Sequence, residues 1–298
     1  MGTTWSVSVC PPPGLSDSDL HAAIEAELAE AVAFFSHWEP SSELSRFNAA
    51  APGFHPVSEA LGVVIAASLG VAEATDGAVD PTLGALVDLW GFGPPGPRAT
   101  GDTPTEQEID AALAVSGWER TRFDEAGALF QPGGLKLDLS GIAKGHTVDR
   151  VSRRLTALGA TSHLVEIGGE LIGQGVKPDG QPWWVELEPP PGFAGPRTLA
   201  ALFEMAVATS GSGERVFAAG GRAYSHTLDG RTGRPITNGV ASVSVFADTA
   251  MDADMLATAL TVMGPVAGMP FAEERGIAAL MVADGAELRT PALDAMLE

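Results

Sequence analysis

The chain has 298 residues, of which 45% are hydrophobic and 18% are charged, and this composition excludes extensive intrinsic disorder. It carries 17 Lys and Arg against 38 Asp and Glu, a formal net charge of −21. Such a surface repels nucleic acid and anionic membranes, so a phosphorylated ligand would need a bound cation or a few local polar groups. The single cysteine, Cys10, excludes an internal disulfide and a cysteine-rich zinc site.

Helical signals dominate the first half of the chain. Apolar spacing predicts a helix over residues 20–35 and a second over 58–74, with Ser58 as its N-cap. Thr105 and Glu108 form a capping-box pattern that opens a third helix toward residue 115. A Gly- and Pro-rich loop over 91–101 precedes it.

The second half changes to short β-prone runs. These predicted strands cover residues 135–139, 163–167, 183–188, 199–209, 240–246 and 277–282, with helices predicted over 143–158 and 249–263. Helices followed by strands favour an α+β fold over a regular βαβ repeat. We expect one compact unit with two lobes over residues 1–298, with no signal peptide and no membrane-spanning run.

The common nucleotide-binding and hydrolase motifs are absent from the sequence. Four segments are nevertheless dense in Gly, Asp, Ser, Thr and His. Residues 137–146 run from a strand through a glycine turn into a helix, where free amides bind anions or turn carbonyls bind a metal; an ordinary turn is the alternative. Asp254 and Thr258, four residues apart on one helix face, suit a hard cation or simply the helix dipole.

Two further segments carry single candidate residues. His226 lies where a strand passes into a tight turn and suits a general base, although a lone histidine is more often a hydrogen-bonded structural residue. Asp80, before Pro81, either fixes a turn or holds a polar group of a ligand. Trp38 and Trp90 are interpreted as packing residues from the sequence pattern alone.

Taken in order, these segments resemble the FAD:protein FMN transferases of the ApbE family over nearly the whole chain. The matching segments are residues 1–3, 41–48, 77–84, 89–91, 138–149, 166–170, 208–211, 226–233 and 253–258. The resemblance implies a T-fold-like α+β flavoprotein with an FAD cleft between its two lobes. It also implies a metal-binding transferase that carries out protein flavinylation, a post-translational modification.

The resemblance further implies roles for individual residues. Mg²⁺, or Mn²⁺ in its place, would be bound by the Ala143 carbonyl, the Asp254 carboxylate and the Thr258 hydroxyl, and His226 would be the catalytic base. FAD contacts would come from Met1, Trp38, Ala78, Val79, Asp80, Ser140, His146 and Leu228.

The implied reaction moves FMN from FAD to a Ser or Thr hydroxyl of an acceptor protein through a phosphoester bond and releases AMP. The acceptor would carry an Asp-x-x-Ser/Thr-Gly-Ala-Ser/Thr type motif. The alternatives are a metal-dependent FAD pyrophosphatase, with water as the nucleophile, and a non-catalytic FAD-binding protein. Many relatives are exported lipoproteins; we expect a cytoplasmic protein unless an upstream export signal has been removed.

Three departures from the family pattern concern the flavin and acceptor loops. Trp38 stands where an aromatic residue, often Tyr, is usual, so stacking is kept but the phenol hydroxyl is lost. Residues 212–214 lack the expected acidic–aromatic pair, and Gly230 replaces the usual proline after Asp229. These loops are therefore expected to differ in detail from those of the family.

Overall fold

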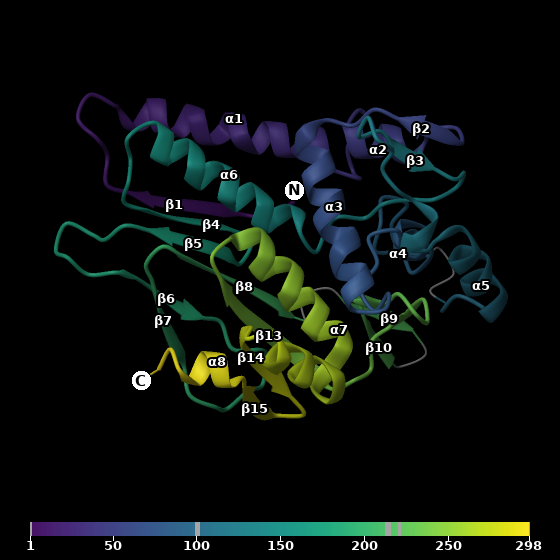
Figure 1. Ribbon diagram of the computed structural model, residues 1–298. Coiled ribbons are helices and arrows are strands. Elements are labelled where there is room, and N and C mark those ends of the chain that lie inside the picture. Colours follow the sequence, from purple (N-terminus) through teal and green to yellow (C-terminus); the bar gives the residue numbers. More distant parts are fainter. Residues whose placement is uncertain (1, 99–101, 212–215, 220–221, 298) are drawn as a thin grey trace. The chain divides into compact units, whose positions relative to one another are not determined.

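The computed structural model describes residues 2–98, 102–211, 216–219 and 222–297 (Figure 1). Its helices and large antiparallel sheet confirm the predicted α+β class. The chain divides into two compact units. The sheet unit comprises Met1–Ala31, Gly141–Gly211 and Gly239–Glu298, and the helical unit comprises Val32–Ser140 and Ser212–Asn238.

The sheet unit is built on a seven-stranded sheet in the order β1-β4-β5-β8-β13-β14-β15, in which every neighbouring pair is antiparallel. Its strands are β1 Trp5–Val9, β4 His163–Ile167, β5 Glu170–Gln174, β8 Met205–Gly211, β13 Val240–Ala247, β14 Ala278–Ala283 and β15 Ala286–Arg289. Side chains alternate across it: Ala279 and Met281 pack in one core cluster, whereas Ala278 and Leu280 pack in another. Both faces of the sheet are therefore covered.

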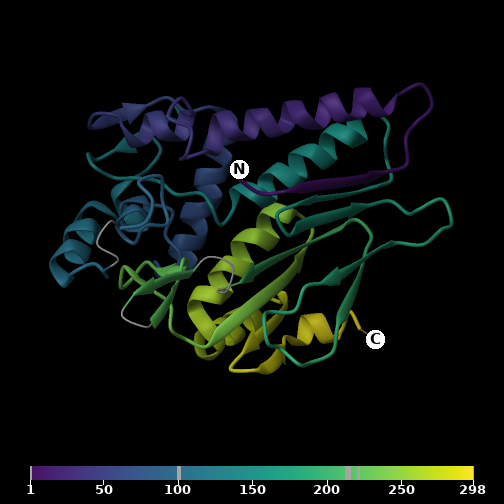
Figure 2. The ribbon, with the colours of Figure 1, turned by 180° about the vertical axis from the view of Figure 1, so that it is seen from behind.

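Helices α6 (Ala143–Ala157) and α7 (Ala250–Glu274) lie side by side along one face, α6 on β4 and β5, and α7 on β8 and β13 (Figures 1 and 2). Helix α1 (Asp17–Phe35) contributes Leu20 and Ile24 to the core beneath α6. On the other face pack the hairpin β6 (Trp183–Leu187) and β7 (Thr198–Leu202), together with α8 (Pro291–Asp294). This layering fixes the first turns of α6 and α7 next to each other.

The helical unit combines helices with small two-stranded sheets. Its elements are α2 Glu43–Asn48, β2 Gly53–His55, α3 Glu59–Ala74, α4 Gly84–Leu89, α5 Glu106–Val115, η1 Trp118–Arg120, β3 Leu129–Gln131, β9 Val216–Ala219, β10 Arg222–Ser225, β11 Leu228–Asp229 and β12 Arg234–Pro235. One of its clusters surrounds Trp90, whose Nε1 donates a hydrogen bond of 2.9 Å to the Gly233 carbonyl. Trp90 is thus the packing residue that the sequence indicated.

The helix starts predicted from caps are confirmed. The Ser58 hydroxyl accepts from the amide of Leu61 at 3.2 Å, at the start of α3. At α5, Thr105 accepts from the Glu108 amide at 3.3 Å while Glu108 Oε2 accepts from the Thr105 amide at 2.8 Å. Local sequence chemistry sets both boundaries.

Two strand predictions are wrong. Residues 135–139 are extended but make only one isolated bridge, because the Asn48 side chain bonds both the amide and the carbonyl of Leu137, at 2.8 and 2.9 Å. The run predicted over 199–209 is two strands, β7 and β8, separated by a turn in which Glu204 adopts φ 49°. Its apolar residues belong to two successive strands in different sheets.

Helix α7 is longer than the predicted 249–263. Gly264 has a non-helical φ of 69°, Pro265 follows it, and a second helical stretch continues to Glu274. Among the residues that the structure describes, α7 is the one helix long and apolar enough to cross a membrane by length and composition, and 56% of its apolar window is buried inside the protein. This burial is typical of a core helix.

Candidate functional site

The first turns of α6 and α7 approach each other closely at two glycines. The Gly145 amide donates a hydrogen bond of 3.0 Å to Asp254 Oδ2, and a Cβ at Gly145 would collide with the Ala250 carbonyl. A Cβ at Gly141 would lie 2.9 Å from the Thr258 hydroxyl oxygen. Glycine gives the space at both positions: a Cβ at Gly145 would meet the α7 backbone, and a Cβ at Gly141 would meet the Thr258 side chain.

This approach places the three predicted metal-binding residues in one neighbourhood. Ala143 lies between the two glycines, one of which contacts Asp254 and the other Thr258. The Ala143 carbonyl, at the first position of α6, already accepts from the Thr147 hydroxyl at 2.6 Å. A carbonyl, a carboxylate and a hydroxyl are hard oxygen donors that suit Mg²⁺.

The predicted donor set contains a single carboxylate. Consistent with this, the described part of the chain has no group of three or more His, Cys, Asp or Glu side chains that could hold a metal ion. A cation held here would therefore keep bound water or take oxygens from a ligand, as Mg²⁺ commonly does.

Two further charged side chains lie beside Asp254. Lys144 Nζ is 2.5 Å from Glu170 Oε1 and also donates to the Gly168 carbonyl at 3.3 Å. Burial raises the pKa of Glu170 to about 8, with the Asp254 charge adding to the shift and Lys144 opposing it. Burial likewise raises the pKa of Asp254. The sequence placed Glu170 in a matching segment but gave it no role, because nothing local shows that it meets Lys144.

His146, a predicted FAD contact, is buried on α6 in the same unit. Burial lowers its pKa to about 4, and the positive charges of Arg153 and Arg150 act in the same direction. The lowered pKa keeps the imidazole neutral at pH 7, and a neutral imidazole can donate one hydrogen bond and accept another.

In the helical unit, Asp80 fixes the turn after α3. Its Oδ1 accepts from the amide and hydroxyl of Thr82 at 2.7 and 2.6 Å, and its Oδ2 accepts from the Trp118 amide at 3.0 Å. Burial raises the pKa of Asp80, against the effect of these hydrogen bonds. The turn-fixing interpretation of Asp80 is therefore confirmed, and a ligand contact by Ala78, Val79 or Asp80 stays a prediction.

The hairpin that carries His226 packs on this turn. The Gly230 amide donates a hydrogen bond of 3.0 Å to the Ala78 carbonyl, and a Cβ at Gly230 would collide with the Gly77 carbonyl. A proline at this position could not make the hydrogen bond, which gives a physical reason for the departure from the family pattern. His226 is half-buried beside the Phe92 ring, with the ring centroids 6.3 Å apart, and Leu228 is buried in the core cluster around Trp90.

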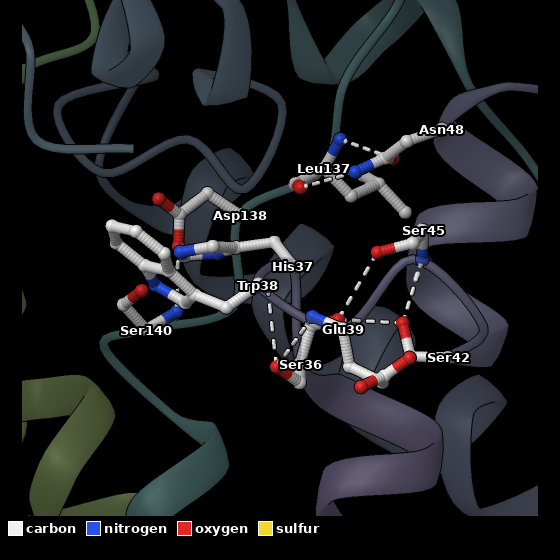
Figure 3. Close-up of polar contacts among 10 residues, drawn as sticks. All are labelled: Ser36, His37, Trp38, Glu39, Ser42, Ser45, Asn48, Leu137, Asp138 and Ser140. Atoms are coloured by element: carbon white, nitrogen blue, oxygen red, sulfur yellow. Dashed lines mark hydrogen bonds and ion pairs between the residues drawn. The ribbon is translucent and has the colours of Figure 1, made fainter. Parts of the chain in front are cut away.

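Trp38 and Ser140 lie in a third group, together with His37 and Asp138 (Figure 3). Asp138 Oδ1 accepts from the Ser140 amide at 2.8 Å and is 3.6 Å from His37 Nδ1. The Trp38 indole is 54% exposed and tilted against the His37 ring, with a centroid distance of 5.6 Å. So exposed an indole is available to stack on a ligand and is not a core residue, contrary to the packing interpretation of Trp38. Sequence reasoning gave no role to His37.

The predicted residues thus fall into groups within each unit. Ala143, His146, Asp254 and Thr258 belong to the sheet unit, and Trp38, Ala78, Val79, Asp80, Ser140, His226 and Leu228 belong to the helical unit. Met1 and residues 212–214 lie outside the described residues. The FAD cleft expected between the lobes stays a prediction.

Comparisons with known proteins agree on one family. Residues 1–281 match the ApbE family. The FAD:protein FMN transferase of Vibrio cholerae is 40% identical over 95% of this chain and 85% of its own length, and that of Klebsiella pneumoniae is 35% identical over 95% and 82%.

Solved structures with a similar fold belong to the same family. The flavin transferase ApbE from Vibrio cholerae superposes with a TM-score of 0.90 at 37% identity, over 99% of this chain and 96% of that one. The apo form of the Pseudomonas stutzeri flavinyl transferase ApbE has a TM-score of 0.88 at 38% identity, over 99% and 94%. This chain belongs to the ApbE family.

Proposed function

We propose that this protein transfers FMN from FAD to a Ser or Thr hydroxyl of an acceptor protein, with Mg²⁺ bound, and releases AMP. The observation that supports the proposal is the position of Ala143 between Gly145, whose amide bonds Asp254, and Gly141, which lies against Thr258. Curated relatives named FAD:protein FMN transferase support the flavin chemistry. The acceptor would carry the Asp-x-x-Ser/Thr-Gly-Ala-Ser/Thr type motif of the family resemblance.

The cation would be held by Asp254, Thr258 and the Ala143 carbonyl. When bound, Mg²⁺ neutralises the charge of the FAD pyrophosphate and the charge that develops as it is cleaved. In a chain with a formal net charge of −21, a local positive charge also offsets the repulsion of an anionic dinucleotide.

The remaining residues bind and orient FAD. The exposed Trp38 indole offers a face for aromatic stacking, and neutral His146 offers one donor and one acceptor. The Asp80 turn is rigid, because its carboxylate is held by three hydrogen bonds, and it can present the backbone of Ala78 and Val79 to a ligand. Met1, Ser140 and Leu228 complete the proposed contacts.

His226 is the proposed base. It takes the proton of the acceptor hydroxyl as that oxygen attacks the phosphorus on the FMN side of FAD. An O–P bond to FMN forms, the bond between the two phosphates breaks, and AMP leaves with the electron pair. An imidazole suits this step because its ring nitrogen can take up a proton from the hydroxyl and later release it.

The test is incubation of the protein with FAD, Mg²⁺ and a protein or peptide carrying the acceptor motif, followed by mass spectrometry of the acceptor and quantification of AMP. We expect one phosphoester-linked FMN on the Ser or Thr, abolished by EDTA. AMP without an adduct would identify a pyrophosphatase, and neither product would leave a binding protein.

Two variants test the assigned roles. Asp254→Ala should lose metal-dependent transfer and keep its fold, whereas the matched Asp252→Ala on the same helix should keep both. His226→Ala should bind FAD and transfer FMN slowly, with the exposed His21→Ala as its control. Normal Mg²⁺-dependent transfer by Asp254→Ala, or unchanged transfer by His226→Ala, would refute the corresponding role.

A further inference from the structure

Glu170 stands at the start of β5, directly after the Gly168–Gly169 turn that joins β4 to β5. Its side chain is 1% exposed. One carboxylate oxygen, Oε1, accepts from Lys144 Nζ at 2.5 Å. The other, Oε2, is buried and has no hydrogen-bond partner among the residues that the structure describes.

A buried oxygen without a partner is costly in a folded protein. Protonation does not remove the problem at Glu170, because an Oε2–H group would then be a buried donor that lacks an acceptor. No described residue makes a hydrogen bond to Glu170 Oε2. The unsatisfied atom therefore points to a hydrogen-bond donor other than the described residues, and a bound water is the simplest one.

The charges around Glu170 indicate that a cation lies near this hydrogen-bond donor. Two carboxylates, Glu170 and Asp254, lie beside a single ammonium group, Lys144, and both acids are nearly completely buried. Lys144 already divides its donors between Glu170 and the Gly168 carbonyl. Two buried carboxylates beside one ammonium group cannot both be ionised without one negative charge in excess, which burial disfavours, and a bound cation would balance that charge.

We propose that Glu170 is a positioning residue of the divalent-cation site: its free Oε2 accepts a hydrogen bond from a cation-bound water. The inference rests on the cation site in the proposed function. Mg²⁺ retains several waters, whose hydrogens need acceptors. Glu170 is close enough to supply one, since it contacts the side chain of Lys144, the residue that follows Ala143. Such outer partners fix the geometry of the inner ligands.

The first experiment measures metal binding directly, without catalysis. Mn²⁺ is titrated into the full-length protein with FAD present and acceptor absent, and the electron paramagnetic resonance signal of free aqueous Mn²⁺ reports the unbound fraction. Glu170→Gln should weaken Mn²⁺ binding by about 10-fold or more, the usual effect of removing such a partner. The matched control is Glu166→Gln, in the same hairpin, whose carboxylate bonds Ser6 and the Gly169 amide; it should bind as the wild type does.

A second variant separates a direct role of Glu170 from one exerted through Lys144. Lys144→Met removes the competing positive charge and leaves both carboxylates, so Mn²⁺ affinity at or above that of the wild type is expected. Any weakening by Lys144→Met would overturn the water-acceptor role, as would Mn²⁺ binding by Glu170→Gln equal to that of Glu166→Gln. If Glu170→Gln lacks a cooperative thermal transition, Glu170→Asp replaces it, and its shorter side chain should also weaken binding.

The outcomes also distinguish this inference from the proposed function. Mn²⁺ binding by the wild type that depends on Glu170, without FMN transfer to any acceptor, would refute the transferase proposal and leave the inference standing. FMN transfer by a wild-type protein that binds no Mn²⁺ would overturn the inference and leave the transfer reaction standing.

Discussion

Asp149, on α6, holds the first turn of α7, the helix that carries Asp254 and Thr258. Its Oδ1 accepts from the Ala250 amide at 2.8 Å and its Oδ2 from the Met251 amide at 3.0 Å. These amides begin a helix and have no partner within it, so a carboxylate satisfies two donors and complements the helix dipole. Asp149→Ala should therefore loosen the link between the two helices.

The size of the effect follows from burial. Ala250 is fully buried, so its amide would be left without an acceptor, whereas Met251 is partly exposed and its amide can reach water. An unsatisfied buried donor costs about 1–3 kcal/mol. Burial also raises the pKa of Asp149, so removing this carboxylate recovers part of that loss. We expect a net destabilisation of about 2 kcal/mol, or about 4 °C in melting temperature for a chain of this size.

Calorimetry at pH 7 measures the melting temperature, and hydrogen exchange over residues 250–254 locates the change. Asp149→Asn keeps one acceptor and should fall between the wild type and Asp149→Ala. Asp252→Ala is the matched control: it leaves the Thr249 cap in place, so its effect should be below about 1 kcal/mol. A melting temperature for Asp149→Ala within one degree of the wild type, with unchanged exchange, would refute this account.

Two other predictions concern folding. Gly145→Ala should destabilise the protein by about 3 kcal/mol or more, because its Cβ would collide with the Ala250 carbonyl. The control Gly70→Ala, in open space on α3, should be neutral or stabilising. Equal melting temperatures for the two variants would contradict the crowding at Gly145. His163 is buried against Ser152, and burial lowers its pKa. The unfolded histidine therefore binds protons first, so stability should fall as the pH drops below about 6.5, and His163→Gln should flatten this fall in melts between pH 7.5 and 5.

The elements that could be predicted are those whose signals are local. Ser58 and Thr105 cap their helices through neighbours three residues away, and such neighbours are read directly from the sequence. Strands 163–167 and 240–246 were also found, since a buried run of β-branched residues is itself a local signal.

The predictions that failed depend on distant partners. Residues 135–139 have the pattern of a strand, but the side chain of Asn48 takes the place of a neighbouring strand at Leu137. Residue spacing cannot show that a residue 89 positions earlier in the chain supplies these hydrogen bonds. The short strands β1 and β5 were missed for a related reason, because their pairing with β4 defines them more than their own composition does.

The candidate site divides in the same way. Asp254 and Thr258 were visible because they are four residues apart on one helix, and the family resemblance added Ala143. Asp149 and Glu170 were not assigned roles, because one acts on a helix about a hundred residues later in the chain and the other on a lysine 26 residues earlier, on α6. Only the fold brings these charges together.

The cluster of Lys144, Glu170 and Asp254 is a poor way to stabilise a protein. Taking ions out of water costs several kcal/mol for each ion, and apolar side chains of similar volume often fill such space at no loss of stability. The helix crossing does not need the charges either, since glycines and small residues already allow the close approach. Buried charge that stability does not explain is typical of functional sites. The free-energy cost of burying these charges is offset when a cation binds only the folded state. Such binding stabilises the fold by RT ln(1 + c/Kd), where c is the concentration of the free cation and Kd is its dissociation constant.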